Sequence, residues 1–157
     1  MTIVKLPKMK RSEIWQLISE QLICRIAFKG DKYPYIAPFQ YVFMNRTLYF
    51  HFTDYGRKMR LLDKSREVSV EIEKCESDMS EYQFVVLSGK LSAVTETQER
   101  TEAIKKMAED GRKKLSTNFL AAHGLMKEEG WPSLGPEKPL VIFKLVDVVE
   151  ELGLKSP

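Results

Sequence analysis

A short basic stretch, HFTDYGRK (residues 51–58), contains the residues best suited to binding chemistry. A helix is expected to begin at Gly56, which places Arg57 and Lys58 in its first turn. Cations are unfavourable there, because the first turn carries the positive end of the helix dipole. Free backbone N–H groups, a glycine that allows close approach and two basic side chains together suit a phosphate monoester. The stretch therefore predicts a phosphate clamp, with a solvated basic surface as the alternative.

Other common phosphate-binding and metal-binding patterns are absent from the sequence. Neither the Walker pattern GxxxxGK[ST] nor the dinucleotide pattern GxGxxG occurs. Cys24 and Cys75 form no CxxC pair, and the two histidines, His51 and His123, are far apart along the chain. Structural zinc sites use four such ligands at short spacings, so we expect no metal ion. The sequence identifies no catalytic residue.

Three further side chains have competing interpretations. His51, at a strand end, fits a buried histidine bonded to a backbone carbonyl as well as it fits a cofactor contact. His123 is more typical of a surface or packing residue. Trp131 follows a glycine in a loop rich in proline and glycine, where tryptophan either packs inside the protein or covers a ligand or subunit seam. His51 and Trp131 therefore remain candidate cofactor-binding residues.

Length and composition are those of an ordinary globular domain. With 157 residues, 43% hydrophobic and 30% charged, the chain is expected to form one domain over residues 1–157. A net charge of +3 disfavours nucleic-acid binding, including the binding of single strands by a small barrel. No apolar run approaches the roughly 20 residues of a membrane span, and no secretory signal begins the chain. We expect a cytoplasmic protein without nucleic-acid or membrane partners.

The hydrophobic patterns predict about six strands and three or four helices. Hairpin connections dominate, so an antiparallel barrel with peripheral helices fits best. Thr95, the first residue of the pattern TETQ, is expected to begin a capping box for the third helix. Strands are expected at 22–28, 33–43, 47–52, 66–74, 82–94 and 140–149, and helices at 12–21, at 56–64, after 98 and at 119–126.

Three local predictions concern the strands. Gly30 and Asp31 suit a tight hairpin turn that needs a positive φ. Pro34 and Pro38 cannot donate ladder hydrogen bonds, so the second strand should be bulged or at an edge where they lie. The run FVVL (residues 84–87) indicates a strand buried on both faces.

Five segments of the chain occur in an order and spacing that resemble a known family. They are GDKYPYIAPFQYVF, TLYFHFTDYGRKMRLL, REVSVEIE, FVVLSGKLSAV and LVIFKLVDVVEELGLK. In this order they resemble the flavin-binding split-barrel family that includes the pyridoxamine 5'-phosphate oxidases, and especially its small nitroimidazole-resistance-like members. The resemblance implies a mainly β (α+β) fold, a six-stranded antiparallel split β-barrel with peripheral helices, that binds FMN.

The same resemblance implies roles for particular residues. The family's phosphate-binding Arg-Lys pair matches Arg57 and Lys58, so the anion of the clamp would be the phosphate of FMN. It also implies a homodimer with the flavin at the subunit interface. The remaining candidates are the residues that would line the ribityl phosphate, His51, Phe52 and Thr53, and the strand whose backbone would bond the flavin's pyrimidine edge, through Pro38, Phe39, Gln40 and Tyr41.

The chain also departs from the oxidases. They carry Arg and Lys at the positions of Ala37 and Val42, so the resemblance implies a flavin site without the side chains that hold a vitamin B6 substrate. We expect an FMN-binding oxidoreductase whose flavin reacts with a small-molecule substrate or electron donor. A flavin carrier or redox sensor without a substrate of its own is the alternative.

Relatives of this family also bind deazaflavin cofactor or haem, which leaves two other ligands open. The longer acidic tail of the deazaflavin cofactor would need extra basic residues along the groove, such as those at 112–114. Haem would need an axial ligand, and His51 and His123 are the only histidines.

Overall fold

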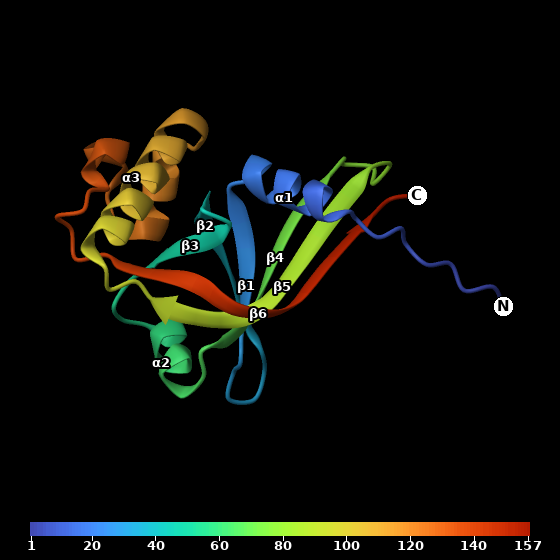
Figure 1. Ribbon diagram of the computed structural model, residues 1–157. Helices are drawn as coiled ribbons and strands as arrows, with labels where there is room; N and C mark the ends of the chain where they lie inside the picture. The colour runs from blue at the N-terminus through green and yellow to red at the C-terminus, as the bar shows by residue number, and fades with distance from the viewer.

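Six strands, each antiparallel to its neighbours, form a closed barrel (Figure 1). They are β1 (Ile23–Phe28), β2 (Tyr35–Met44), β3 (Thr47–Phe52), β4 (Glu67–Cys75), β5 (Tyr82–Ala93) and β6 (Val141–Lys155). Around the barrel their order is β1–β2–β3–β6–β5–β4. This computed structural model, which describes all residues 1–157, confirms the predicted six-stranded antiparallel barrel.

The barrel interior is filled by the inward faces of the strands and closed by two helices. Inward residues alternate along each strand, as Val68, Val70 and Ile72 do in β4, because successive side chains of a strand point to opposite faces. Helices α1 (Arg11–Glu20) and α2 (Arg57–Lys64) lie on opposite sides of the barrel (Figure 1). Both helices add apolar side chains to this main core, namely Ile14, Leu17 and Ile18 from α1 and Leu61 and Leu62 from α2.

A second apolar cluster lies outside the barrel wall. Helix α3 (Thr97–Lys114) and three short 3₁₀ helices, η1 (Thr117–His123), η2 (Lys127–Glu129) and η3 (Trp131–Ser133), form a separate helical group (Figure 1). The group packs on the outward faces of β2, β3 and β6 through Val42, Tyr49 and Ile142. None of the helices combines the length and the apolar character that crossing a membrane requires.

Strand β2 changes partner half-way along. Residues 35–40 pair with β1, whereas residues 41–44 pair with β3. Tyr41 donates its N–H to the carbonyl of Leu22 on the β1 side. Backbone groups of successive strand residues alternate in direction, so those of Pro38 and Gln40 face the edge that has no strand neighbour. The missing N–H of Pro38 is tolerated there, which confirms its predicted edge position.

The last strand, β6, runs well beyond its predicted end at Val149. The extension is bulged, because Ser88 of β5 pairs with Glu150 while Lys90 pairs with Val146. Asp147 has a φ of 51° inside this bulge. The polar residues at the bulge interrupt the alternation, so the sequence pattern ends there although the pairing resumes. The tail of β6 also meets the N-terminal segment, where Lys155 donates its N–H to the carbonyl of Pro7.

Helix ends differ from the predictions by short distances. The cap of α3 is Glu96 and not Thr95, because the Glu96 carboxylate accepts from the N–H groups of Gln98 and Glu99. The helix expected at 119–126 is instead a 3₁₀ helix that ends at His123, where the next residue, Gly124, has a φ of 74°. The first helix begins at Arg11.

Two predictions for the strands were wrong. The backbone of Gly30 does not adopt a positive φ; a glycine is needed there because a Cβ would lie 1.6 Å from the carbonyl oxygen of Tyr33. The run FVVL in β5 is buried on one face only. Val85 and Leu87 point into the barrel, whereas Phe84 and Val86 are half-exposed on its outer wall.

Candidate functional site

The N-terminus of α2 is open and has no side-chain cap. Gly56 precedes the helix with a φ of 101°, and a Cβ at this position would meet no atom within 4 Å. The first helical residues are Arg57 and Lys58, and no side chain accepts a capping hydrogen bond. Because first-turn N–H groups lack partners within the helix, this end of α2 offers hydrogen-bond donors and a positive potential.

The four basic residues of α2 divide into two pairs. Arg60 and Lys64 contact the carboxylate of Asp31, in the loop between β1 and β2, at 2.9 and 2.7 Å. These two hydrogen-bonded cations lower the pKa of Asp31. Arg57 and Lys58 take part in no ion pair. The cations closest to the helix start are therefore the ones left without an anion.

Arg57 and Lys58 lie against aromatic rings instead of carboxylates. The guanidinium carbon of Arg57 is 4.7 Å from the ring centroid of Tyr35. The Nζ atom of Lys58 is 5.3 Å from the ring of Phe39 and 5.9 Å from that of Phe52. Partial burial lowers the pKa of Lys58, as expected for a cation taken from water without a carboxylate to compensate. Cation–π contacts hold both side chains beside the helix start.

The predicted residues of β2 divide between the two faces of the strand. Phe39 and Tyr41 point into the barrel core, and Tyr41 donates its hydroxyl hydrogen to the carbonyl of Ile18 at 2.5 Å. This burial raises the pKa of Tyr41. Pro38 is exposed, and Gln40 is buried under α3 on the outer face. The inward side chains of Phe39 and Tyr41 cannot meet a ligand outside the barrel, whereas the backbone of the strand and the exposed Pro38 can.

The three predicted residues at the end of β3 occupy different environments. Phe52 is fully buried in the barrel core. Thr53 is half-buried and donates its hydroxyl hydrogen to the carbonyl of Tyr55 at 3.0 Å. His51 points to the outer face and is only 6% exposed. The three residues are adjacent in sequence, but the structure places their side chains in three different environments.

A buried chain of hydrogen bonds joins β3, η1, β2 and α3. The Nδ1 atoms of His51 and His123 are 3.1 Å apart. The Nε2 atom of His123 is 2.8 Å from Oε1 of Gln40. Gln40 in turn donates from Nε2 to the carbonyl oxygen of Met107, at 3.0 Å. Both ring nitrogens of His123 and the amide of Gln40 thus have partners, as buried polar groups require.

Burial keeps both imidazoles neutral near pH 7. It is the largest cause that lowers the pKa of His51 to about 3, and the nearby His123 and the Lys58 cation lower it further. Burial also lowers the pKa of His123 to about 4. Folding therefore disfavours the charged form of each ring.

The sequence did not predict the pairing of His51 with His123. The two residues are 72 positions apart, and His123 had been interpreted as a surface or packing residue. It is 5% exposed and packs against the rings of Phe119 and Trp131. The apolar neighbours of His123 in η1 are the only sequence feature that could have indicated that this histidine is buried.

Trp131 is a buried member of the second apolar cluster. Its Nε1 donates to the carbonyl of Leu115 at 3.1 Å, and its ring lies edge-on to His123 with centroids 5.7 Å apart. Trp131 thus contacts the candidate site through His123. Its own role as a cofactor contact stays a prediction.

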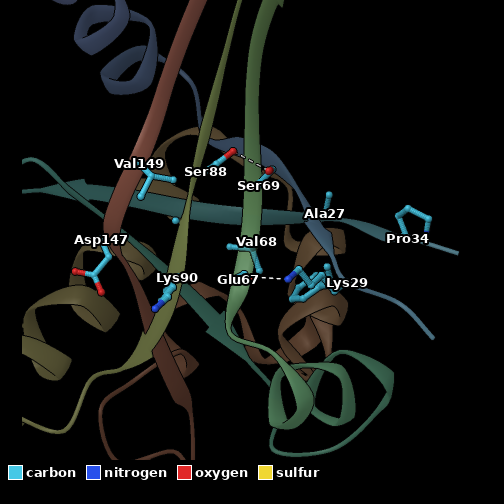
Figure 2. Close-up of a pocket in the computed structure, with 12 residues that line it drawn as sticks. Ala27, Lys29, Pro34, Glu67, Val68, Ser69, Ser88, Lys90, Asp147 and Val149 are labelled. Atoms are coloured by element: carbon cyan, nitrogen blue, oxygen red, sulfur yellow. Dashed lines mark hydrogen bonds and ion pairs between the residues drawn. The ribbon is translucent and has the colours of Figure 1, made fainter. Parts of the chain in front are cut away.

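A separate hollow of about 440 Å³ lies on the outer wall of the barrel. Figure 2 shows its lining from β1, β4, β5 and the bulge of β6, including Ser69, whose hydroxyl is 2.9 Å from that of Ser88. Lys29 and Glu67 form an ion pair at its edge, and the exposed Val149 borders it. None of the sequence-predicted site residues lines this hollow.

Comparison with known proteins identifies the family. The family model described as pyridoxamine 5'-phosphate oxidase matches residues 10–124, which includes α2, both histidines and all of β1 to β5. The chain belongs to this family. The match confirms the resemblance inferred from the sequence, and no curated protein is similar enough in sequence to count as a match.

Solved structures of other members of the fold are similar over nearly the whole chain. An FAD-binding protein from Mesorhizobium loti has a TM-score of 0.71 at 16% identity, covering 98% of this chain and 100% of its own. The FAD-binding protein from Mycobacterium smegmatis has a TM-score of 0.61 at 16% identity, covering 95% and 97%. A candidate 5-nitroimidazole antibiotic resistance protein from Bacteroides thetaiotaomicron has a TM-score of 0.66 at 17% identity, covering 96% and 87%. At these identities the likeness shows a shared fold.

Proposed function

We propose that this member of the pyridoxamine 5'-phosphate oxidase family binds FMN, with the flavin phosphate at the start of α2. The observation that carries the proposal is the division of the α2 cations. Asp31 neutralises Arg60 and Lys64, whereas Arg57 and Lys58 lie at the helix start without an acidic partner. A phosphate there would receive the N–H groups of the first turn and two charge-assisted hydrogen bonds.

The free edge of β2 supports the proposed position of the flavin ring. The backbone groups of Pro38 and Gln40 face the edge that lacks a strand neighbour. A pyrimidine edge, with its alternating N–H and C=O groups, would find partners along such a strand. When bound, the flavin would supply hydride or electron transfer, while the protein holds and orients it. The ligand we propose for this edge is the isoalloxazine of FMN.

The similar structures favour a flavin over other ligands of this barrel. Two of them are described as FAD-binding proteins, and FAD contains the whole of FMN. We propose FMN because the clamp of Arg57 and Lys58 suits one terminal phosphate. The chemistry we propose is that of an oxidoreductase acting on a small molecule, and a flavin carrier or redox sensor is the second candidate, because Ala37 and Val42 provide no charged side chain for a substrate.

We further propose that the protein acts as a homodimer with the flavin at the subunit interface. Support comes from the outer wall of the barrel, where the hollow of Figure 2 is bordered by Val149, which is 87% exposed. Ile36 on the neighbouring β2 is 62% exposed. Exposed apolar side chains mark an interface where they form a contiguous patch, and we propose that these two belong to one dimer face. Sedimentation equilibrium of the flavin-loaded protein would test this, with a monomer mass as the contrary result.

The decisive experiment is an absorption spectrum of the purified protein, followed by mass spectrometry of the supernatant after denaturation. An oxidised-flavin spectrum with the mass of FMN supports the proposal, and the mass of FAD would correct the cofactor. A Soret band or a deazaflavin spectrum would replace the ligand while keeping the barrel. A colourless protein that fails to bind added FMN would overturn the proposal. Steady-state reduction of the bound flavin by a donor would then separate an oxidoreductase from a carrier.

A further inference from the structure

A second hollow, of about 220 Å³, opens between helix α1 and the barrel. Val148 lines it, whereas the next residue, Val149, lines the hollow of Figure 2. Because successive strand residues point to opposite faces, the two hollows lie on opposite sides of β6. None of the candidate flavin-site residues at 51–53, 57 and 58 lines the second hollow. Its apolar wall is made of Trp15, Ile18, Phe43, Leu48, Leu87 and Leu145.

Two arginines that line this hollow meet on the indole of Trp15. The guanidinium carbon of Arg11 lies 4.9 Å from the ring centroid, and that of Arg46 lies 4.6 Å from a ring centroid of the same indole. Neither arginine takes part in an ion pair. Cation–π contacts therefore hold two like charges beside one aromatic side chain, with no carboxylate bound to either of them.

Both arginines occupy positions that local preferences disfavour. Arg11 is the first residue of α1, where the helix dipole disfavours a cation. Arg46 is the second residue of the two-residue turn between β2 and β3 and has a φ of 60°, a conformation for which glycine is preferred. A residue held in such a conformation is often part of a ligand-binding site. Their convergence on one indole favours a role in binding over a role in folding.

The indole N–H of Trp15 is available to a ligand as well. Trp131 donates its Nε1 hydrogen to the carbonyl of Leu115, whereas Nε1 of Trp15 has no such partner. The one buried side-chain oxygen or nitrogen without a partner is Oε1 of Glu71, so the indole nitrogen of Trp15 reaches solvent. The hollow thus offers two guanidinium groups and one N–H to an acceptor.

Glu151 is the only acidic residue that lines the hollow. It is the ladder partner of Leu87, so its side chain lies on the same face of the sheet as that leucine. With Arg11 and Arg46 also in the lining, the hollow carries a net charge of +1. A bound anion is therefore attracted overall, and the Glu151 carboxylate weakens that attraction.

We propose that this hollow binds a small monocarboxylate whose apolar body is about one aromatic ring. The carboxylate accepts hydrogen bonds from Arg11, Arg46 and the Trp15 indole, and the ring packs on the apolar wall. An engineered apolar cavity of about 150 Å³ holds a benzene molecule, so 220 Å³ has room for a ring and a carboxylate. This site goes beyond the proposed flavin site and does not depend on it.

The two tryptophans of the chain provide a direct test. In a proton–nitrogen correlation spectrum, Trp15 and Trp131 each give one indole signal, and Trp15→Phe assigns them. Benzoate should shift the Trp15 signal saturably, with a Kd of about 1 mM or tighter, as expected for a ligand of this size. The Trp131 signal should stay in place, because that indole is buried away from the hollow. The absence of a saturable Trp15 shift would overturn the proposal.

Two related molecules test which parts of the ligand are recognised. Benzamide has the ring without the charge, and it should bind at least about tenfold more weakly, because it loses the charge-assisted hydrogen bonds. Acetate has the charge without the ring, and it should also bind at least about tenfold more weakly, because it buries little apolar surface. An affinity equal to that of benzoate for either molecule would contradict a site for aromatic carboxylates.

Arg46→Gly separates a binding role from a structural one. Glycine adopts the positive φ freely, so thermal unfolding should show a protein at least as stable as the parent. Benzoate affinity should fall at least about tenfold with the loss of one charged donor. Arg112→Ala, which removes an arginine of α3 outside the hollow, is the matched control and should leave the affinity unchanged. Unchanged benzoate affinity in Arg46→Gly would overturn the proposal.

Glu151→Gln tests the same site in the opposite direction. It removes the acidic charge from the lining while keeping the length of the side chain, so benzoate should bind several-fold more tightly, by about the amount that one nearby like charge costs. This variant leaves both arginines in place and is informative even if Arg46→Gly fails to fold. Weaker or unchanged benzoate binding in Glu151→Gln would contradict the assigned position of the carboxylate.

Discussion

Gly111 gives the indole of Trp131 room to lie against helix α3. A Cβ at Gly111 would come within 2.3 Å of the Trp131 ring, which is itself fixed by its hydrogen bond to the carbonyl of Leu115. A glycine inside a helix is usually unfavourable by about 1 kcal/mol relative to alanine. Here it is required, because the helix and the loop that contains Trp131 approach each other at this position. The helical group that covers His123 depends on this contact.

Gly111→Ala should therefore destabilise the protein, although alanine is the better helix former. Overpacking a fixed ring costs typically about 1–3 kcal/mol, which outweighs the gain in helix propensity. The free energy of unfolding from urea titration would measure it, with the exposed Lys105→Ala in the same helix as control, expected within about 0.5 kcal/mol of the parent. A Gly111→Ala protein more stable than the parent would show that the loop moves aside at little cost.

The division of the α2 cations predicts different effects of similar substitutions. Arg57→Ala and Lys58→Ala should each weaken FMN binding by roughly 1.5–3 kcal/mol, the range for hydrogen bonds to charged groups. Arg60→Ala is the matched control, because Arg60 is paired with Asp31, and its effect on affinity should stay within about 0.5 kcal/mol. Fluorescence titration of the apoprotein with FMN measures all three. Equal losses for the three variants would mean that general positive charge, and not a clamp, attracts the flavin.

Arg57→Ala should leave the apoprotein as stable as the parent. Arg57 has no acidic partner and lies where the helix dipole disfavours a cation, so only its contact with the ring of Tyr35 is lost. Thermal unfolding without flavin checks this. A large fall in the unfolding temperature would assign Arg57 a structural role.

Tyr41→Phe should lower stability without changing FMN affinity. The Tyr41 hydroxyl is the hydrogen-bond partner of the Ile18 carbonyl near the end of α1, so its removal leaves a buried carbonyl unpaired at a cost of about 1–3 kcal/mol. The side chain points away from any ligand on the outer wall, and the backbone is unchanged. Urea unfolding and FMN titration of the same variant provide the two readings. A clear loss of affinity would place the hydroxyl in the flavin site.

The buried histidines predict loss of stability in mild acid. The pKa of His51 falls to about 3 and that of His123 to about 4 on folding, so the unfolded chain binds more protons below its histidine pKa of about 6.5. The free energy of unfolding is therefore complete above pH 6.5 and declines as pH falls below it, by up to about 1.4 kcal/mol per pH unit for each ring.

Urea unfolding between pH 5 and 7 measures this slope before most carboxylates titrate. His51→Asn should remove about half of it, because one of the two titrating rings is gone. A stability independent of pH over this range would mean that the rings are not buried in the neutral form in solution.

The barrel could be predicted from the sequence because each strand is specified by the pattern of residues within that strand. Alternation in residues 66–74 defines which side chains point inward, and the missing N–H of Pro38 already implies an edge. The basic residues at the start of α2 could likewise be identified from their types and their spacing in the sequence. In each case a few neighbouring residues carry the whole physical argument.

The parts that escaped prediction depend on contacts between distant segments. Asp31 lies 29 residues before Arg60, and no local pattern shows that it neutralises that cation while Arg57 stays free. The same holds for the pairing of His51 with His123 and for the fit of Trp131 against Gly111. The end of β6 was predicted too early, because the bulge at Asp147 breaks the alternation on which strand prediction rests.

The position of β6 between β3 and β5 has a consequence for how the chain folds. It is the last strand in sequence, yet its pairing with both neighbours closes the barrel. Until β6 has been synthesised, β3 and β5 expose unpaired edges that can recruit another chain. Because these closing contacts span long stretches of sequence, folding should be slow. Nascent chains that stop before residue 141 should therefore be the ones most prone to aggregate and to bind chaperones.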